Sequence, residues 1–261
     1  MEALPLTSQN VLHQKSEHQK FGSVKKKSCG VRGPVLVCDN IEEWLRPSCE
    51  AYRALYVPRP QTWGDIQSHV DTFAESDERK SNKRKLEEQA RMSGDIRSEQ
   101  VLETELGDKA QSIMDAAVGY GLPAEMADII REDFKQVGMV LGRMAPSANI
   151  SLKLDLMGEG SCSRWHRDNC IGRALVSYNL CGTECVDNAS VDMKELEKLG
   201  DNAHSVRDQR DIFSADVGGI LFMKGSLYKS EQNGLIHRSP GKRYHGNGKV
   251  KNRLMLKIDL C

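Results

Sequence analysis

His166 and Asp168 lie two positions apart in the stretch 163–169, SRWHRDN, and could bind one metal ion together. On a strand, side chains i and i+2 point to the same side, so this imidazole and this carboxylate can converge. A third ligand must come from elsewhere, and His237, in NGLIHRSP, offers a second imidazole from a later strand. Two histidines and one carboxylate leave about three coordination positions open, which suits non-haem Fe(II). The predicted metal ligands are therefore His166, Asp168 and His237.

A zinc site is the alternative that the same residues leave open. His166, His237 and one nearby cysteine could complete a tetrahedral site. The cysteines available for it are Cys162, Cys170, Cys181 and Cys185. The eight cysteines of the chain are dispersed, and we expect them to be mostly reduced, buried or metal-bound.

The elements that position these ligands are predicted to be strands. From residue 148 onward, NISLKLDLM, RALVSYNL and NRLMLKIDL alternate in hydropathy, and DVGGILFMKG is an apolar run after a turn. Strands without intervening helices indicate an antiparallel sandwich or barrel. The exception is 187–211, a polar insertion with a short helix around 191–199, which could cover the site as a lid.

The preceding part of the chain has a helical pattern. Residues 105–119 and the segment from Pro123 to about Arg143 carry apolar residues at spacings of three and four. We expect a flexible leader at 1–33, a mainly helical region at 34–147 and a strand-rich domain at 148–261. The charged segment 75–100 within the helical region is interpreted as a solvated helix or linker, with a nuclear-import patch as the alternative.

Composition excludes several classes of function. The chain has 261 residues, 39% hydrophobic and 28% charged, with 37 basic and 37 acidic side chains. A net charge near zero gives no strong signal for nucleic acid, and no segment reaches membrane-spanning length. A cytoplasmic protein, with nuclear import as the alternative, is the expectation. The nucleophile elbow of hydrolases, the phosphate-binding loop and the dinucleotide fingerprint are absent from the sequence.

The order of motifs over 164–259 resembles an uncharacterised bacterial domain-of-unknown-function family. The matching blocks are His166-Arg-Asp168, Arg173-Ala-Leu, Gly182-Thr-Glu184, Asp216-Val-Gly, Gly234-Leu-Ile-His237-Arg-Ser-Pro240 and Arg253-Leu-Met-Leu. Bacterial members of that family are often encoded near zinc-homeostasis genes. The resemblance therefore also implies a zinc-binding or zinc-homeostasis-linked protein without redox chemistry.

More distantly, the order of His-x-Asp, a strand from Asp216 to Phe222 and a distal histidine is similar to the 2-oxoglutarate/Fe(II)-dependent oxygenases. This resemblance implies an α+β fold, with the N-terminal helical region packed on a double-stranded β-helix, the cupin-like jelly-roll barrel. It implies Fe(II) and 2-oxoglutarate as cofactors and hydroxylation of an unknown small-molecule or protein substrate, with no catalytic residues beyond the metal ligands. A cupin-like adaptor without activity is the remaining alternative.

The same resemblance implies a basic residue on the final strand that pairs with the far carboxylate of 2-oxoglutarate. The planar guanidinium of arginine suits that role because it meets a carboxylate at two points. Arg253 opens the last predicted strand and is the first candidate, followed by Arg238 and Arg173. Arg253 lies 16 residues after His237 and is followed by Leu254 and Met255, whereas the common pattern has about ten residues and then x-Ser.

Overall fold

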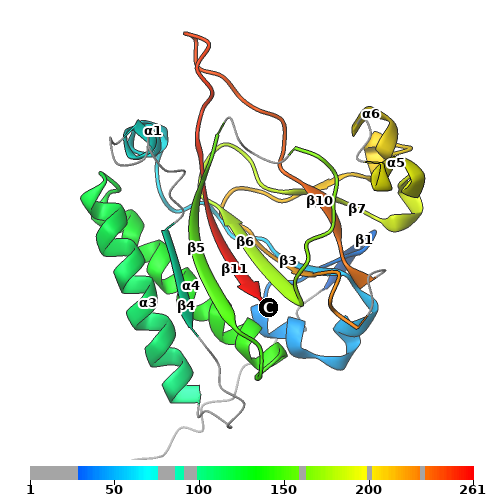
Figure 1. The fold of residues 1–261 in the computed structure, drawn as a ribbon, viewed down its shortest axis with the longest axis horizontal. Coiled ribbons are helices and arrows are strands. Elements are labelled where there is room, and N and C mark those ends of the chain that lie inside the picture. The colour runs from blue at the N-terminus through cyan, green and yellow to red at the C-terminus, as the bar shows by residue number, and fades with distance from the viewer. Residues whose placement is uncertain (1–28, 76–85, 91–98, 159–162, 199–201, 230–232) are drawn as a thin grey trace, which may run out of the picture.

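A computed structural model describes residues 29–75, 86–90, 99–158, 163–198, 202–229 and 233–261 (Figure 1). The expected leader at 1–33 and the charged segment at 75–100, with its nuclear-import alternative, lie largely outside these residues. Within the described residues, no helix is both long and apolar enough to span a membrane.

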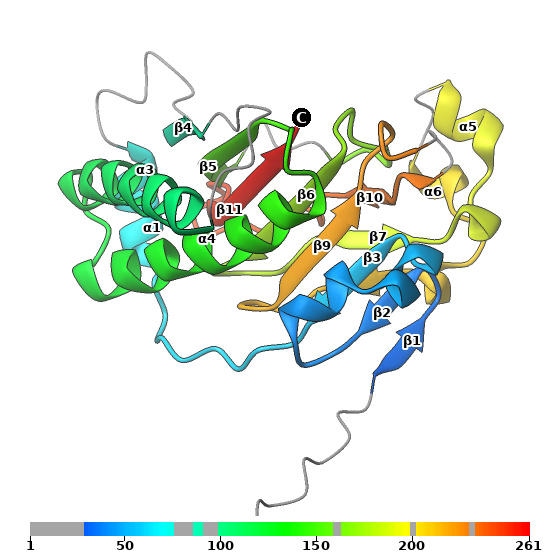
Figure 2. The ribbon, with the colours of Figure 1, turned by 90° about the horizontal axis from the view of Figure 1, so that it is seen from below.

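Two long antiparallel helices cover one face of a large sheet (Figures 1 and 2). The described helices are α1 (Gln67–Glu75), α3 (Glu99–Gly119), α4 (Ala124–Met144), α5 (Met193–Glu197) and α6 (Asn202–Ser205). The predicted apolar stripes are confirmed, because residues such as Leu106, Ile113, Ile130 and Phe134 are buried between α3, α4 and the sheet. Pro123 precedes α4 as expected, since its fixed φ suits the start of a helix.

The large sheet has eight strands in the order β1-β2-β3-β9-β6-β11-β5-β4. These strands are β1 (Gly30–Arg32), β2 (Val35–Val37), β3 (Ala54–Val57), β4 (Leu86–Ala90), β5 (Ile150–Met157), β6 (Gly172–Ser177), β9 (Ile220–Lys224) and β11 (Arg253–Leu260). All pairings are antiparallel except that of β2 with β3. The alternation of NRLMLKIDL places Leu254, Leu256 and Ile258 against the helices.

The other face of the large sheet packs on a three-stranded sheet. This smaller sheet has the order β10-β7-β8, with strands β7 (Glu184–Val186), β8 (Phe213–Ser214) and β10 (Ile236–Arg238). Cys185 and Phe213 of the small sheet share an apolar cluster with Leu221 and Met255 of the large one. A mixed α+β protein with strands stacked in two layers is thus confirmed. The pairings between described strands do not join the two sheets into a closed barrel.

The N-terminal part contributes more strands than its sequence predicts. Residues 34–147 are expected to be mainly helical, yet β3 pairs with β9 and β4 pairs with β5. The strand β4, LEEQA, lies within the charged segment, and its sequence has no alternation of apolar and polar residues that would predict a strand. Its strand conformation is therefore a product of pairing with β5, because tertiary context overrides weak local preference. The strand-rich body begins before residue 148.

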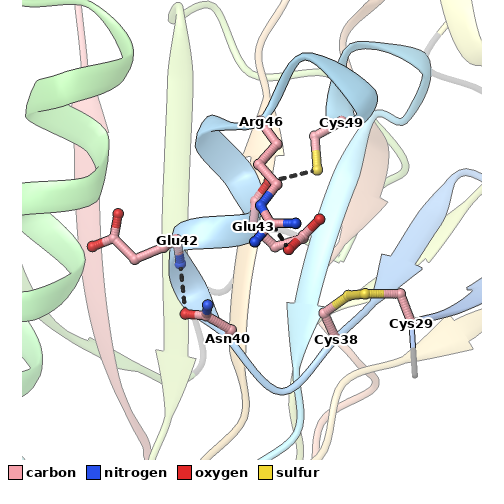
Figure 3. The surroundings of a disulfide bond; sticks show 7 residues. All are labelled: Cys29, Cys38, Asn40, Glu42, Glu43, Arg46 and Cys49. Carbon is pink, nitrogen blue, oxygen red and sulfur yellow. Dashed lines mark hydrogen bonds and ion pairs between the residues drawn. A yellow bond between two sulfur atoms is a disulfide. The ribbon is translucent and has the colours of Figure 1, made fainter. Parts of the chain in front are cut away.

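A disulfide joins Cys29 and Cys38 at the edge of the large sheet (Figure 3). The two cysteines flank the paired strands β1 and β2, so the bond closes this hairpin. The cysteines are expected to be mostly reduced, buried or metal-bound; this pair is oxidised, and its member Cys38 is buried. Cys49, Cys170, Cys181, Cys185 and Cys261 are free.

The insertion 187–211 packs on the outer face of the small sheet, beside β7 and β10 (Figure 1). Its short predicted helix is confirmed as α5. Val191, Leu196 and Val206 of the insertion form an apolar cluster with Trp165 and with Ile236. Through these contacts the described part of the insertion supports the small sheet from outside.

Candidate metal centre

The backbone brings His166 and His237 together across an antiparallel bridge. Each residue donates its N–H to the carbonyl oxygen of the other, at 3.0 Å in both directions. Residues directly opposite one another in such a pair project their side chains to the same face. Consistent with this, the two imidazole centroids are 4.5 Å apart.

Asp168 completes the cluster two residues after His166. Its Oδ1 lies 3.5 Å from His166 Nε2, and its Oδ2 lies 3.0 Å from His237 Nε2. The ligand atoms of these three residues all lie within 4.8 Å of one another. Among the described residues this is the one group of three or more His, Cys, Asp or Glu side chains with that geometry.

Both imidazoles are oriented to present Nε2 to the cluster. His166 Nδ1 lies 2.8 Å from the carbonyl oxygen of Arg164, and His237 Nδ1 lies 3.2 Å from that of Leu235. A carbonyl oxygen only accepts, so each Nδ1 carries a hydrogen in these contacts. In the neutral imidazole the lone pair then remains on Nε2, which is how metal-binding histidines are usually held.

The electrostatics of the cluster favour an ionised carboxylate. Burial raises the pKa of Asp168, but contacts with His166 and His237 and the charge of Arg173 outweigh it and hold that pKa well below its usual range. Burial lowers the pKa of His166, whereas its contacts with Asp168 and the Arg164 carbonyl raise it more, so the net pKa is raised. The buried Asp168 Oδ2 lies within ion-pair distance of His237 and Arg173 yet makes no hydrogen bond of normal geometry. These features fit a site that a cation completes.

The backbone of Asp168 is fixed by the end of β9. Ser226 donates its N–H to the Asp168 carbonyl oxygen at 2.8 Å, and Gly225 donates to that of Ile171 at 3.0 Å. A Cβ at position 225 would overlap the carbonyl group of Cys170. Glycine is required here because the two segments approach closely.

The three candidate arginines lie in three different surroundings. Arg173, on β6, forms ion pairs with Asp168 and, at 2.5 Å through Nε, with Asp259. Arg238, on β10, forms an ion pair with Glu184 at 2.6 Å and stacks over the Trp165 ring. Because Arg238 neighbours His237 on a strand, it points to the opposite, outer face of the small sheet.

Arg253 is the one of the three candidate arginines that forms no ion pair with a carboxylate among the described residues. Its side chain is 4% exposed and donates to the Cys181 carbonyl oxygen at 3.3 Å and to Ser239 Oγ at 3.1 Å. Burial lowers its pKa more than the nearby charges of Cys181 and Glu184 raise it, and no carboxylate of the described residues forms an ion pair with the guanidinium. It lies on the same face of β11 as Asp259, six residues away, which is about 20 Å of strand. Its partner Ser239 lies only two residues after His237 in the chain, so this contact joins the guanidinium to the segment that carries a candidate metal ligand.

Two charged pairs between the sheets were missed by the sequence reasoning. Lys257 Nζ lies 2.9 Å from Asp155 Oδ2, and Lys153 Nζ lies 3.4 Å from Asp259 Oδ2. The signal was available in SLKLDLM and RLMLKIDL, where charged residues fall on one face of strands whose other face is fully apolar. Strands with charged residues on a face that another sheet covers indicate a polar cavity or an ion-pair network.

Comparison with known proteins gives one family and distant structural likenesses. The family described as Protein of unknown function (DUF1826) matches residues 65–259. A search of curated proteins found no match. Full-length T7H of Neurospora crassa, solved in complex with alpha-KG, is 12% identical at a TM-score of 0.37, over 84% of this chain and 77% of that one. A putative oxygenase from Shewanella oneidensis is 12% identical at a TM-score of 0.35, over 85% of this chain and 86% of that one. These TM-scores are too low for either likeness to support a fold or a function here.

Proposed function

We propose that this chain, which belongs to the DUF1826 family of proteins of unknown function, is an oxygenase dependent on Fe(II) and 2-oxoglutarate. The observation that carries the proposal is the convergence of His166, Asp168 and His237 within 4.8 Å. Two imidazoles and one carboxylate are the donor set of non-haem Fe(II) sites that keep positions open for other ligands. Both imidazoles present Nε2 to the carboxylate of Asp168, so the residues fit such an ion.

The winding of the chain supports a double-stranded β-helix as the fold. From β5 to β11, the strands β5 and β6 belong to the large sheet, β7 and β8 to the small one, and β9, β10 and β11 then alternate between the two. The stretch with His166 contributes a further bridge to β10 between β5 and β6. Eight segments distributed in this way follow the path of a jelly roll, whose two sheets face each other. The helical region would then be a cover packed on the outside of the large sheet.

The chemistry that bound Fe(II) and 2-oxoglutarate supply is the oxidation of a C–H bond by dioxygen. The protein holds the ligand set by backbone contacts that orient each imidazole. Arg253 would bind the far carboxylate of 2-oxoglutarate, because a buried guanidinium without an acidic partner gains most from an anionic ligand. The apolar cluster between the sheets, with Leu221 and Met255, would limit the access of water.

The charges between the sheets also favour an acidic ligand. Four basic side chains, Lys153, Arg173, Lys257 and Arg253, face three carboxylates, Asp155, Asp168 and Asp259. Among these seven described residues, the basic groups therefore exceed the acidic groups by one before any metal ion binds. A divalent cation would increase the positive excess, and a dicarboxylate would offset it.

A closed zinc site is less well supported by the described cysteines. The ligand cluster contains no cysteine among the described residues, and Cys162 lies outside them. Cys170 and Cys185 are buried, and neither belongs to the ligand cluster.

Metal content and 2-oxoglutarate turnover of anaerobically purified protein test the proposal. The wild-type protein should bind about one Fe(II), give a weak visible charge-transfer band with 2-oxoglutarate, and consume it. His166→Ala and Asp168→Ala should abolish the band and the turnover. His245→Ala is the matched control, since His245 pairs with Asp71 at 3.0 Å outside the ligand cluster. An absent band in the wild-type protein, or an unchanged one in both ligand variants, rejects the assignment.

A further inference from the structure

Arg173 links the candidate metal ligand Asp168 to a second buried carboxylate. Its guanidinium contacts Asp168 Oδ2 through one terminal nitrogen and Asp259 Oδ1 through Nε, at 2.5 Å in the latter case. Different nitrogens of one planar group thus serve two carboxylates, which fixes the plane of the guanidinium. Arg173 in turn holds the Asp168 carboxylate through its Oδ2.

The position of Asp259 follows from the register of the large sheet. Asp259 of β11 lies directly opposite Arg173 of β6, so both project into the space between the sheets. Lys153 of β5 contacts the second oxygen of Asp259 at 3.4 Å. The contacts therefore run in the order Lys153, Asp259, Arg173, Asp168 across three neighbouring strands, and Asp259 is 4% exposed.

From this arrangement we propose that Asp259 is a positioning residue, which acts through Arg173 to set the orientation and charge of Asp168 as a metal ligand. The inference rests on the metal site of the proposed function. Without Asp259, the positive charge of Arg173 next to Asp168 is compensated less, so it opposes a bound cation more strongly. The guanidinium also loses the contact that fixes its plane, and Asp168 loses its defined orientation. Removal of an outer partner of a metal ligand commonly weakens metal binding about 10- to 100-fold.

Titration of metal-free, full-length protein with Co(II), followed by its visible ligand-field spectrum, tests this role without turnover. Asp259→Asn should weaken Co(II) binding about 10- to 100-fold and alter the spectrum. Asp133→Asn is the matched control, because it removes another buried carboxylate from an arginine, Arg59, outside the ligand cluster. The control should bind Co(II) with wild-type affinity and an unchanged spectrum.

A double-mutant cycle separates action through Arg173 from a general structural effect. In an Arg173→Met background, Asp259→Asn should change the Co(II) affinity less than threefold. Wild-type affinity for Asp259→Asn alone, or the same loss in both backgrounds, overturns the proposal.

A second variant of Asp259 and two results with the wild-type protein complete the test. If Asp259→Asn does not fold, Asp259→Glu replaces it: a several-fold loss of affinity supports the role, because the longer side chain displaces Arg173, and unchanged affinity overturns it. A wild-type protein that binds no Co(II) refutes the metal site itself. Co(II) binding without 2-oxoglutarate turnover refutes the oxygenase proposal but leaves the role of Asp259 intact.

Discussion

At the scale of single residues, substitution by methionine should destabilise the protein much more at Arg173 than at Arg253. Arg253→Met removes a buried cation that lacks a carboxylate, so the free energy of unfolding should change by no more than about 1 kcal/mol. Arg173→Met leaves Asp168 and Asp259 without their cation and should cost about 3 kcal/mol or more. Urea unfolding of the two metal-free variants measures the contrast.

The same Arg253→Met variant should lose affinity for 2-oxoglutarate by at least about tenfold, since a charge-assisted pair contributes roughly 1.5–3 kcal/mol. Calorimetric titration of the Fe(II)-loaded protein measures this loss. Arg238→Met is the control with intact cosubstrate binding, because Arg238 pairs with Glu184 on the outer face. Equal affinities of the Arg253→Met and wild-type proteins would remove Arg253 from the site.

Some of these residues could be predicted from the sequence and others could not. The spacing of His166 and Asp168 suffices to predict their convergence, although the structure places them beside an isolated bridge and not on a strand, and His237 joins them across that bridge. The choice among three arginines depends on which carboxylates lie nearby, and a single sequence does not contain that information. Asp259 was missed for the same reason, because its partner Arg173 is 86 residues away in the chain.

At the scale of elements, the described part of the insertion 187–211 should stabilise the segments that carry the two histidines. Trp165 and Ile236 each precede a histidine of the candidate metal centre and belong to one apolar cluster with Leu196 of the insertion. Leu196→Ala should therefore cost about 2 kcal/mol of unfolding free energy and weaken Co(II) binding several-fold. Thermal unfolding and the Co(II) titration report the two effects.

The control for that substitution is Val118→Ala on α3, where the side chain is 42% exposed. It should change the free energy of unfolding by no more than about 0.5 kcal/mol and leave metal binding unaltered. A Leu196→Ala protein with wild-type stability would show that the insertion is dispensable to the small sheet. Retained stability with lost metal binding would instead favour a role nearer the ligands.

Helices and strands whose apolar residues recur at a regular spacing could be predicted from the sequence. Strands that form because they pair with a distant strand could not. The helices α3 and α4 follow from apolar residues three and four positions apart, which form one continuous stripe. The long strands β5 and β11 follow from alternation. By contrast, the short strands β3 and β4 are defined by pairing with β9 and β5, at sequence separations that local preference does not reach.

At the scale of the whole molecule, helices, large sheet and small sheet form successive layers (Figure 2). The α+β composition was predictable because the hydropathy period changes near residue 148. The order of strands was not predictable, since register and pairing depend on contacts between distant segments. This order determines that Arg253, Asp259 and Arg173 share the space between the sheets.

The most direct test of the account is a crystal structure of the protein grown without oxygen in the presence of Fe(II) and 2-oxoglutarate. We expect one metal ion bonded to His166 Nε2, His237 Nε2 and a carboxylate oxygen of Asp168, and the far carboxylate of 2-oxoglutarate on the Arg253 guanidinium. Metal bound elsewhere in the chain would contradict the central claim. The central claim would also be contradicted if the metal ion bound these three residues together with a fourth protein ligand and no 2-oxoglutarate.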